Sequence, residues 1–216
     1  MANKQFPYRL YLVTDEGSMA GRDLLWVVEE AVKGGVDLVQ LREKRLAGDA
    51  FLLRAKRLKA ILDKYNVPLI INDNLWVAEQ CGAAGIHVGN SDVPPAAVKQ
   101  EWPECSLLGL SIEYEQQLDT EDARLADYLA LSPVFLTATK TDTVTEWQLE
   151  GVQRMRGMTD KPLVAIGGIS QLNAAQVINA GADCLAVVSA ICSADSPEYA
   201  AAQLRNEIEK GLQSSH

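Results

Sequence analysis

Residues 38–65 read LVQLREKRLAGDAFLLRAKRLKAILDKY, and the fold prediction starts from this stretch. Its first part, Leu38–Arg42, is a short apolar run with a polar end, which is typical of a buried strand. An amphipathic helix is predicted next, over Asp49–Tyr65, with Asp49 as its cap and an apolar stripe of Phe51, Leu52, Ala55, Leu58, Ile61 and Leu62. A strand followed by such a helix is the repeating unit of a parallel sheet.

The same unit recurs along the whole chain. Further strand-like runs are Arg9–Thr14, Pro68–Asn72, Gly85–Gly89, Leu107–Ser111, Tyr128–Ser132, Pro162–Gly167 and Cys184–Ser189, and the last helix is predicted over 197–210. Eight units account for the chain. We therefore predict an α/β protein with a single (β/α)8 TIM barrel over 1–216, in which 1–7 and 211–216 are loose tails. A compact doubly wound sheet is the competing fold.

The composition excludes several classes of protein. Of the 216 residues 48% are hydrophobic and 23% are charged, as in ordinary globular chains, and the net charge of −9 opposes binding to nucleic acid or anionic lipid. The apolar runs are shorter than the roughly 18 residues of a membrane span, and the N-terminus lacks a signal-like apolar region, so a cytoplasmic location is predicted. Four separated cysteines without a CxxC pair favour reduced thiols.

Polar residues follow the apolar runs at the place where a barrel carries its function, the carboxyl ends of the strands. Gln40, Arg42 and Lys44 are spaced by two, so a strand continuing through them would present all three on one face. Two cations and an amide suit a multiply charged phosphate. The alternative is a charged strand edge neutralised by Glu43.

Asp73 and Asp92 end consecutive units, whose strands would lie about 4.8 Å apart in a barrel. Two carboxylates with room for water and phosphate suit Mg²⁺, which prefers hard oxygen ligands. The structural alternatives are a loop cap for Asp92, which precedes Val93-Pro94-Pro95, and an Asx turn for Asp73.

A second anion site is predicted at the end of the barrel series. Gly167-Gly168 ends the seventh run and Val188-Ser189 the eighth, and these two strands often supply a phosphate cradle of backbone N–H groups. The polar, threonine-rich segment after the sixth run is interpreted as a lid over 136–146 that brings Lys140 to a bound anion, with a plain surface loop as the alternative. His87 is expected to be a packed or hydrogen-bonded histidine.

Six segments carry a family resemblance: YLVTD (11–15), LVQLREK (38–44), IND (71–73), GIHVG (85–89), PVFLTATK (133–140) and AIGGI (165–169). Together they resemble the motifs of thiamine-phosphate synthases, in the same order and across nearly the whole chain. The resemblance implies a Mg²⁺-dependent transferase that joins hydroxymethylpyrimidine diphosphate to hydroxyethylthiazole phosphate. It also implies a dissociative carbocation mechanism, with thiamine monophosphate and pyrophosphate as the products.

The resemblance also implies roles for individual residues. Contacts with the pyrimidine diphosphate would come from Gln40, Arg42, Lys44, Asn72, Ser111 and Lys140, of which Arg42, Lys44, Ser111 and Lys140 would be catalytic. The thiazole phosphate would contact Thr137, Thr139, Gly168, Val188 and Ser189. The magnesium ligands would be Asp73 and Asp92.

Two other functions stay open, a thiazole tautomerase-like isomerase on the same barrel and a non-catalytic sensor of thiamine phosphate. The expected partners are the small-molecule substrates, without nucleic acid or membrane. Assembly into a homo-oligomer also stays open, because interface patches on barrel helices resemble packing faces.

Overall fold

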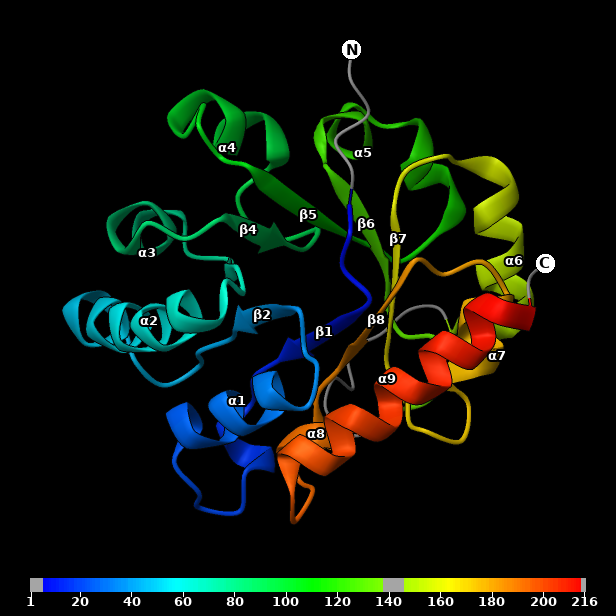
Figure 1. The fold of residues 1–216 in the computed structure, drawn as a ribbon. Coiled ribbons are helices and arrows are strands. Elements are labelled where there is room, and N and C mark those ends of the chain that lie inside the picture. Colours follow the sequence, from blue (N-terminus) through cyan, green and yellow to red (C-terminus); the bar gives the residue numbers. More distant parts are fainter. Residues whose placement is uncertain (1–5, 138–145, 215–216) are drawn as a thin grey trace.

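The structure is a computed structural model that describes residues 6–137 and 146–214 (Figure 1). Every predicted strand-like run overlaps a strand, and the strands form a closed parallel barrel in which β8 pairs with β1. The strands are β1 (Leu10–Val13), β2 (Leu38–Leu41), β3 (Leu69–Asn72), β4 (Gly85–Val88), β5 (Leu107–Ile112), β6 (Tyr128–Leu131), β7 (Leu163–Ile166) and β8 (Cys184–Val187). The TIM-barrel prediction is confirmed, and closure excludes the open, doubly wound sheet.

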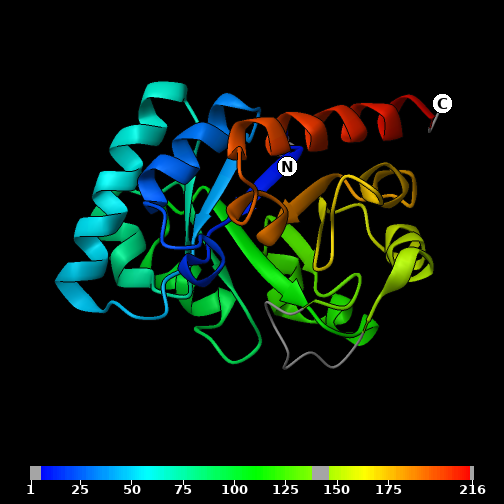
Figure 2. The ribbon, with the colours of Figure 1, turned by 90° about the horizontal axis from the view of Figure 1, so that it is seen from below.

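The helices surround the strands, as Figures 1 and 2 show. They are α1 (Leu24–Lys33), α2 (Gly48–Leu62), α3 (Leu75–Cys81), α4 (Pro95–Glu101), α5 (Glu121–Leu125), α6 (Gln148–Met158), α7 (Ala174–Asn179), α8 (Ser189–Cys192) and α9 (Pro197–Ser214), with single 3-10 turns η1 (Glu16–Ser18), η2 (Asp63–Tyr65) and η3 (Glu115–Asp119). The predicted capping role of Asp49 is wrong, because α2 follows Ala47 at its N-cap and Asp49 lies in the first turn.

Some residues predicted to belong to loose tails pack against the barrel and its helices. The helix α9 continues to Ser214, and Gly211 lies so close to α7 that an added Cβ would come within 2.8 Å of the Ala175 carbonyl oxygen. At the other end the ring of Phe6 lies 5.3 Å from that of Tyr128. The structure thus differs from the predicted tails at Phe6 and at 211–214. None of the helices within the described ranges is long and apolar enough to cross a bilayer.

Alternate residues of each strand point into the barrel or out toward the helices. The inward cluster contains Tyr11, Val13, Leu38, Ile70, Leu107, Tyr128, Ala130, Val164, Cys184 and Ala186. The outward residues pack against the helices in a larger cluster. Because side chains alternate with a period of two, the last inward position of a strand faces the carboxyl-end mouth. Gln40, Asn72 and Ser111 occupy such positions.

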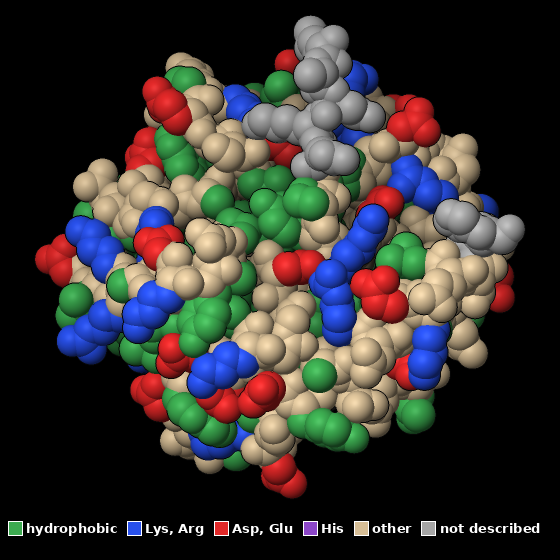
Figure 3. Space-filling model, viewed as in Figure 1, with side chains coloured by type: hydrophobic (Ala, Val, Ile, Leu, Met, Phe, Trp, Pro, Cys, Tyr) green, Lys and Arg blue, Asp and Glu red, His purple; other side chains and the backbone are tan. Residues whose placement is uncertain are grey.

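Three aspartates lie at the opposite end of the barrel, each just before a strand. Asp37, Asp127 and Asp183 accept hydrogen bonds from backbone N–H groups at the start of β1, β5 and β7. Each also forms an ion pair, with Arg205, Lys99 and Arg156 respectively. On the face seen in Figure 3, acidic and basic side chains lie beside one another without a large patch of one sign. The three aspartates therefore tie the starts of β1, β5 and β7 to the segments that precede β2, β6 and β8.

Candidate active site

A cavity of about 510 Å³ lies at the carboxyl ends of the strands and is lined by residues from all eight strand ends. Every predicted site residue that the structure describes lines it, namely Gln40, Arg42, Lys44, Asn72, Asp73, Asp92, Ser111, Thr137, Gly168, Val188 and Ser189. Thr139 and Lys140, with most of the predicted lid, lie outside the described residues. The sequence positions chosen as strand ends thus meet in one place.

Arg42 reaches the cavity from a loop, because β2 ends at Leu41. The strand therefore does not continue through Arg42 and Lys44, the condition under which all three side chains would share one strand face, yet both residues and Gln40 line the same cavity. The Arg42 backbone N–H donates to the Thr14 hydroxyl at 3.1 Å, and its guanidinium donates to the Asp15 carboxylate at 3.1 Å. These two bonds hold the guanidinium at the mouth.

Glu43 stabilises the loop that carries Lys44. Its carboxylate accepts hydrogen bonds from the backbone N–H groups of Arg45 and Leu46 and pairs with the Arg54 guanidinium at 2.6 Å. The side chain of Glu43 is only 3% exposed. Because these contacts of Glu43 are with its own loop and with Arg54, they do not support the alternative of a strand edge neutralised by Glu43.

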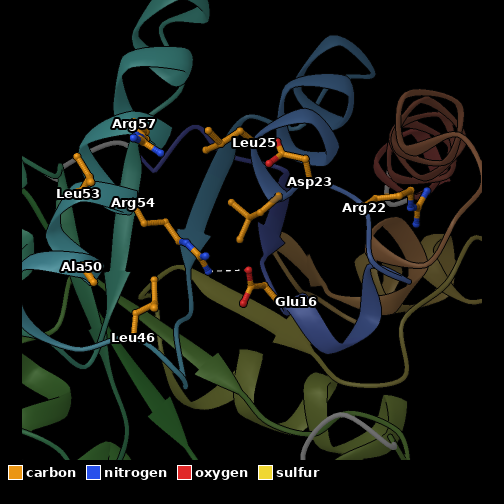
Figure 4. A pocket seen from close by; sticks show the side chains of 10 residues that line it. Glu16, Arg22, Asp23, Leu25, Leu46, Ala50, Leu53, Arg54 and Arg57 are labelled. Carbon is orange, nitrogen blue, oxygen red and sulfur yellow. Dashed lines mark ion pairs between the residues drawn. The ribbon is translucent and has the colours of Figure 1, made fainter.

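A second, smaller pocket of about 340 Å³ lies outside the barrel, beside α1 and α2 (Figure 4). Arg54, which lines it, also pairs with Glu16 at 2.7 Å, the contact drawn as a dashed line in Figure 4. Arg22, on its other side, donates to the backbone carbonyls of Cys192 and Ala194. These arginines therefore tie the segment after β1 to α2 and to the end of α8.

Asp73 and Asp92 line the cavity from adjacent strands. Asp73 follows β3 directly with a φ of 62°, a left-handed conformation that aspartate tolerates better than most residues, and its backbone N–H donates to the His87 carbonyl. Asp92 accepts from the Gly89 N–H at 2.8 Å through Oδ2. Asp92 therefore caps the turn after β4 through one carboxylate oxygen, as the loop-cap alternative predicts. It does not start a helix, because α4 begins at Pro95.

The donor set at this edge fits Mg²⁺. Two carboxylates offer hard oxygen ligands, and Mg²⁺ is often held by one or two carboxylates together with substrate phosphates and water. Among the residues that the structure describes, no group of three or more His, Cys, Asp and Glu forms a complete protein cage. Such an ion would therefore need oxygens from a phosphate ligand as well.

Gly167 and Gly168 form the turn after β7 with φ values of 103° and 64°. A Cβ on Gly167 would lie 2.5 Å from Pro133 Cβ, and one on Gly168 would lie 2.7 Å from Phe135 Cβ. The Phe135 N–H donates to the Gly167 carbonyl. Glycine is thus required here for both backbone conformation and space, because the first residues after β6 pack directly on the turn.

Val188 and Ser189 complete this side of the cavity. They stand at the junction of β8 and the short helix α8, and they line the cavity together with the glycine turn. The Asn173 side chain donates to the Gly168 carbonyl, and its oxygen accepts from the Ser170 N–H at 2.9 Å. Asn173 therefore stabilises the glycine turn, and the turn itself lines the cavity.

Some cavity residues escaped the sequence reasoning. Tyr11 and Glu113 line the cavity, and Asp15 holds Arg42. Asp15 lies just after β1, at the carboxyl end of the strand. Polar residues at this position in other units were predicted to be site residues, so the same criterion applied to the first strand would have found Asp15. His87 is confirmed as a hydrogen-bonded histidine: its ring nitrogens lie 3.0 Å from the Tyr128 and Ser111 hydroxyl oxygens. Burial raises the pKa of Tyr11 and Tyr128 far above their ordinary value.

The closed parallel barrel, with cations, paired carboxylates and a glycine turn around its carboxyl-end mouth, defines a β/α-barrel protein of the class that binds phosphate-bearing small molecules. The sequence model of a protein family that is described as thiamine monophosphate synthase matches residues 10–191 of the chain. The chain therefore belongs to the thiamine monophosphate synthase family.

Individual relatives agree with this assignment. The chain is 48% identical over 201 residues to a protein of Albidiferax ferrireducens named thiamine-phosphate synthase, covering 93% of this chain and 92% of that one. It is 45% identical to a protein of the same name from Vibrio campbellii, covering 91% and 96%. Among solved structures, a thiamine phosphate pyrophosphorylase from Pyrococcus furiosus superposes with a TM-score of 0.87 at 29% identity, covering 95% and 98%.

Proposed function

We propose that the protein is a transferase that condenses hydroxymethylpyrimidine diphosphate with hydroxyethylthiazole phosphate, giving thiamine monophosphate and pyrophosphate. The observation that carries the proposal is the gathering of two cations, two carboxylates and a glycine turn around one cavity. Full-length relatives at 45–48% identity that are named thiamine-phosphate synthase support the same reaction.

The chemical step we propose breaks the C–O bond between the pyrimidine methylene and pyrophosphate, and the bond electrons leave with pyrophosphate. The electron-rich aminopyrimidine stabilises the methylene cation, and the thiazole nitrogen donates its lone pair to form the new C–N bond. No protein nucleophile is needed. The protein has to stabilise the leaving group, align the two rings and exclude water.

Arg42 and Lys44, with Lys140, would stabilise the departing pyrophosphate by charge. Asp15 and Thr14 support this role, because they hold Arg42 in place before a ligand arrives. Lys44 is exposed on its loop and can turn toward a diphosphate, whereas Arg42 is held more rigidly. Asn72, Gln40 and Ser111 would contact the same substrate from deeper in the cavity.

Asp73 and Asp92 would hold Mg²⁺, since both carboxylates line the cavity. When bound, the ion neutralises charge on the leaving pyrophosphate. Asp92 has one carboxylate oxygen engaged with Gly89, which leaves the other for a ligand. On the far side, Gly168, Val188 and Ser189, with Thr137 and Thr139, would bind the thiazole phosphate.

The experiment that tests the function supplies the purified protein with both substrates and Mg²⁺ and measures pyrophosphate. The proposed synthase releases pyrophosphate only when both substrates are present. A tautomerase-like isomerase would convert a thiazole phosphate without releasing pyrophosphate, and a sensor would bind ligands without turnover. Absence of pyrophosphate under these conditions would reject the proposal.

A further inference from the structure

A chain of four hydrogen bonds runs across the inside of the barrel, and four of its five residues line the cavity. Gln40 Nε2 donates to the Tyr11 hydroxyl at 2.7 Å, and the Tyr11 and Tyr128 hydroxyl oxygens lie 3.0 Å apart. The Tyr128 oxygen lies 3.0 Å from His87 Nδ1, and His87 Nε2 lies 3.0 Å from Ser111 Oγ. The chain therefore joins two predicted substrate contacts, Gln40 and Ser111.

Most of this chain is buried, although Tyr11, Gln40, His87 and Ser111 also line the cavity. Tyr11 and Tyr128 are almost completely buried, and Gln40 and His87 are buried as well. Gly109 of β5 supplies the space, because a Cβ there would overlap the Tyr128 hydroxyl and His87 Nδ1. A buried hydroxyl proton without an acceptor costs free energy, so we expect each of the two tyrosine hydroxyls to donate to a neighbour in the chain.

The direction of the bonds follows from the Gln40 amide. Because Tyr11 accepts from Gln40, its own proton goes to Tyr128, and the Tyr128 proton then goes to His87 Nδ1. With Nδ1 as an acceptor, the neutral imidazole carries its proton on Nε2 and donates it to Ser111 Oγ. The Ser111 hydroxyl proton is thereby left to face a ligand.

We propose that Tyr11, Tyr128 and His87 are positioning residues that fix the hydrogen-bonding polarity of both ends of this chain. Ser111 is held as a donor toward the cavity, and Gln40 is held with its carbonyl oxygen as the amide atom offered to a ligand N–H. The site then selects a substrate ring that presents an acceptor to Ser111 and a donor to Gln40. The consequence for catalysis rests on the proposed function, whereas the polarity itself does not.

Histidine nitrogen NMR tests the polarity directly, since the chain has only two histidines, His87 and His216. The full-length protein is labelled with nitrogen-15 histidine, and a His216→Gln variant assigns the signals. Spectra are taken above the ordinary imidazole pKa of about 6.5, where the tautomer is resolved. We expect His87 to be protonated on Nε2 alone. Protonation on Nδ1 would overturn the proposal, because His87 would then donate to Tyr128, and Ser111 would have to donate its own proton to Nε2.

A Tyr128→Phe variant tests the link to catalysis, with Tyr8→Phe as the matched control. The control removes a tyrosine hydroxyl that lies outside the chain. We expect Tyr128→Phe to lose the single His87 tautomer, lower kcat/KM about tenfold for the pyrimidine substrate and leave the KM of the thiazole phosphate unchanged. An unchanged tautomer and rate in a folded variant would overturn the proposal.

These outcomes separate the inference from the function. If the wild-type protein releases no pyrophosphate, the proposed function fails while the tautomer result still stands. If the tautomer is Nδ1–H, the inference fails while the synthase reaction stands. The wild-type spectrum alone decides the polarity even if Tyr128→Phe does not fold.

Discussion

Arg42→Ala is the substitution with the clearest expected effect on turnover. Its guanidinium lines the cavity, has a side chain that is 17% exposed, and is held by Asp15 at 3.1 Å. A preorganised charge of this kind stabilises negative charge that develops as the leaving group departs. By comparison with a single oxyanion-hole donor, its removal costs about 2–4 kcal/mol of transition-state stabilisation, or about 30-fold to 1,000-fold in rate.

The same substitution should leave the fold nearly intact. The ion pair it removes is partly exposed, with 17% and 24% of the two side chains open to solvent, so it contributes about 0–1 kcal/mol to folding. In a domain of this size that loss lowers Tm by no more than about 2–4 °C. Asp15 keeps a hydrogen bond from the Ser18 hydroxyl at 2.8 Å and access to water.

The assay measures initial rates of pyrophosphate release, together with thermal unfolding. Because the charge acts on the departing group, kcat should fall more than KM rises. Arg45→Ala is the matched control, since Arg45 is an exposed arginine on the same loop and does not line the cavity. A folded Arg42→Ala protein with a rate near that of the wild type would refute the role assigned to Arg42.

Lys140→Ala should also lose most turnover with an unchanged Tm, and normal initial rates would remove Lys140 from the leaving-group site. Asp73→Asn should raise the Mg²⁺ concentration needed for half-maximal activity; an unchanged metal titration would contradict the metal role. Burial raises the pKa of the Cys192 thiol to about 11 from 9.0, and the side chain is inaccessible to solvent, so alkylation of the folded protein at about pH 8 should be at least about 100-fold slower than that of a free thiol. The contribution of this shift to stability is fully present below pH 9 and is lost as the pH rises through about 11. Mass spectrometry of labelled peptides measures the alkylation rate, and equally fast labelling of Cys192 in the folded and unfolded states would refute the prediction.

Strand positions were predictable because the signal for them is local. Alternation with a period of two gives each strand an inward set, and the last inward residues, such as Gln40 and Ser111, reach the mouth wherever the barrel closes. The glycine turn was predictable for a similar reason. The packing of this turn against Pro133 and Phe135 could not be predicted, because the residues in contact are distant in sequence.

The missed features depend on long-range contacts. Asp15 and Arg42 are 27 residues apart, and the Tyr11–Tyr128 contact spans 117 residues, so no spacing rule joins them. The end of α9 was missed because its polar composition at 211–214 conceals the close approach of Gly211 to α7. Sequence pattern thus locates the cavity, whereas the contacts that orient its side chains require the fold.

The proposed function requires that the protein condenses two phosphorylated substrates in one cavity. A phosphorus NMR time course with both substrates and Mg²⁺ is the most direct test of this requirement. The expected result is loss of both substrate signals with equal amounts of pyrophosphate and thiamine monophosphate formed, and no pyrophosphate when the thiazole phosphate is omitted. Product formation that is unequal, or pyrophosphate release that does not depend on the thiazole phosphate, would contradict the account.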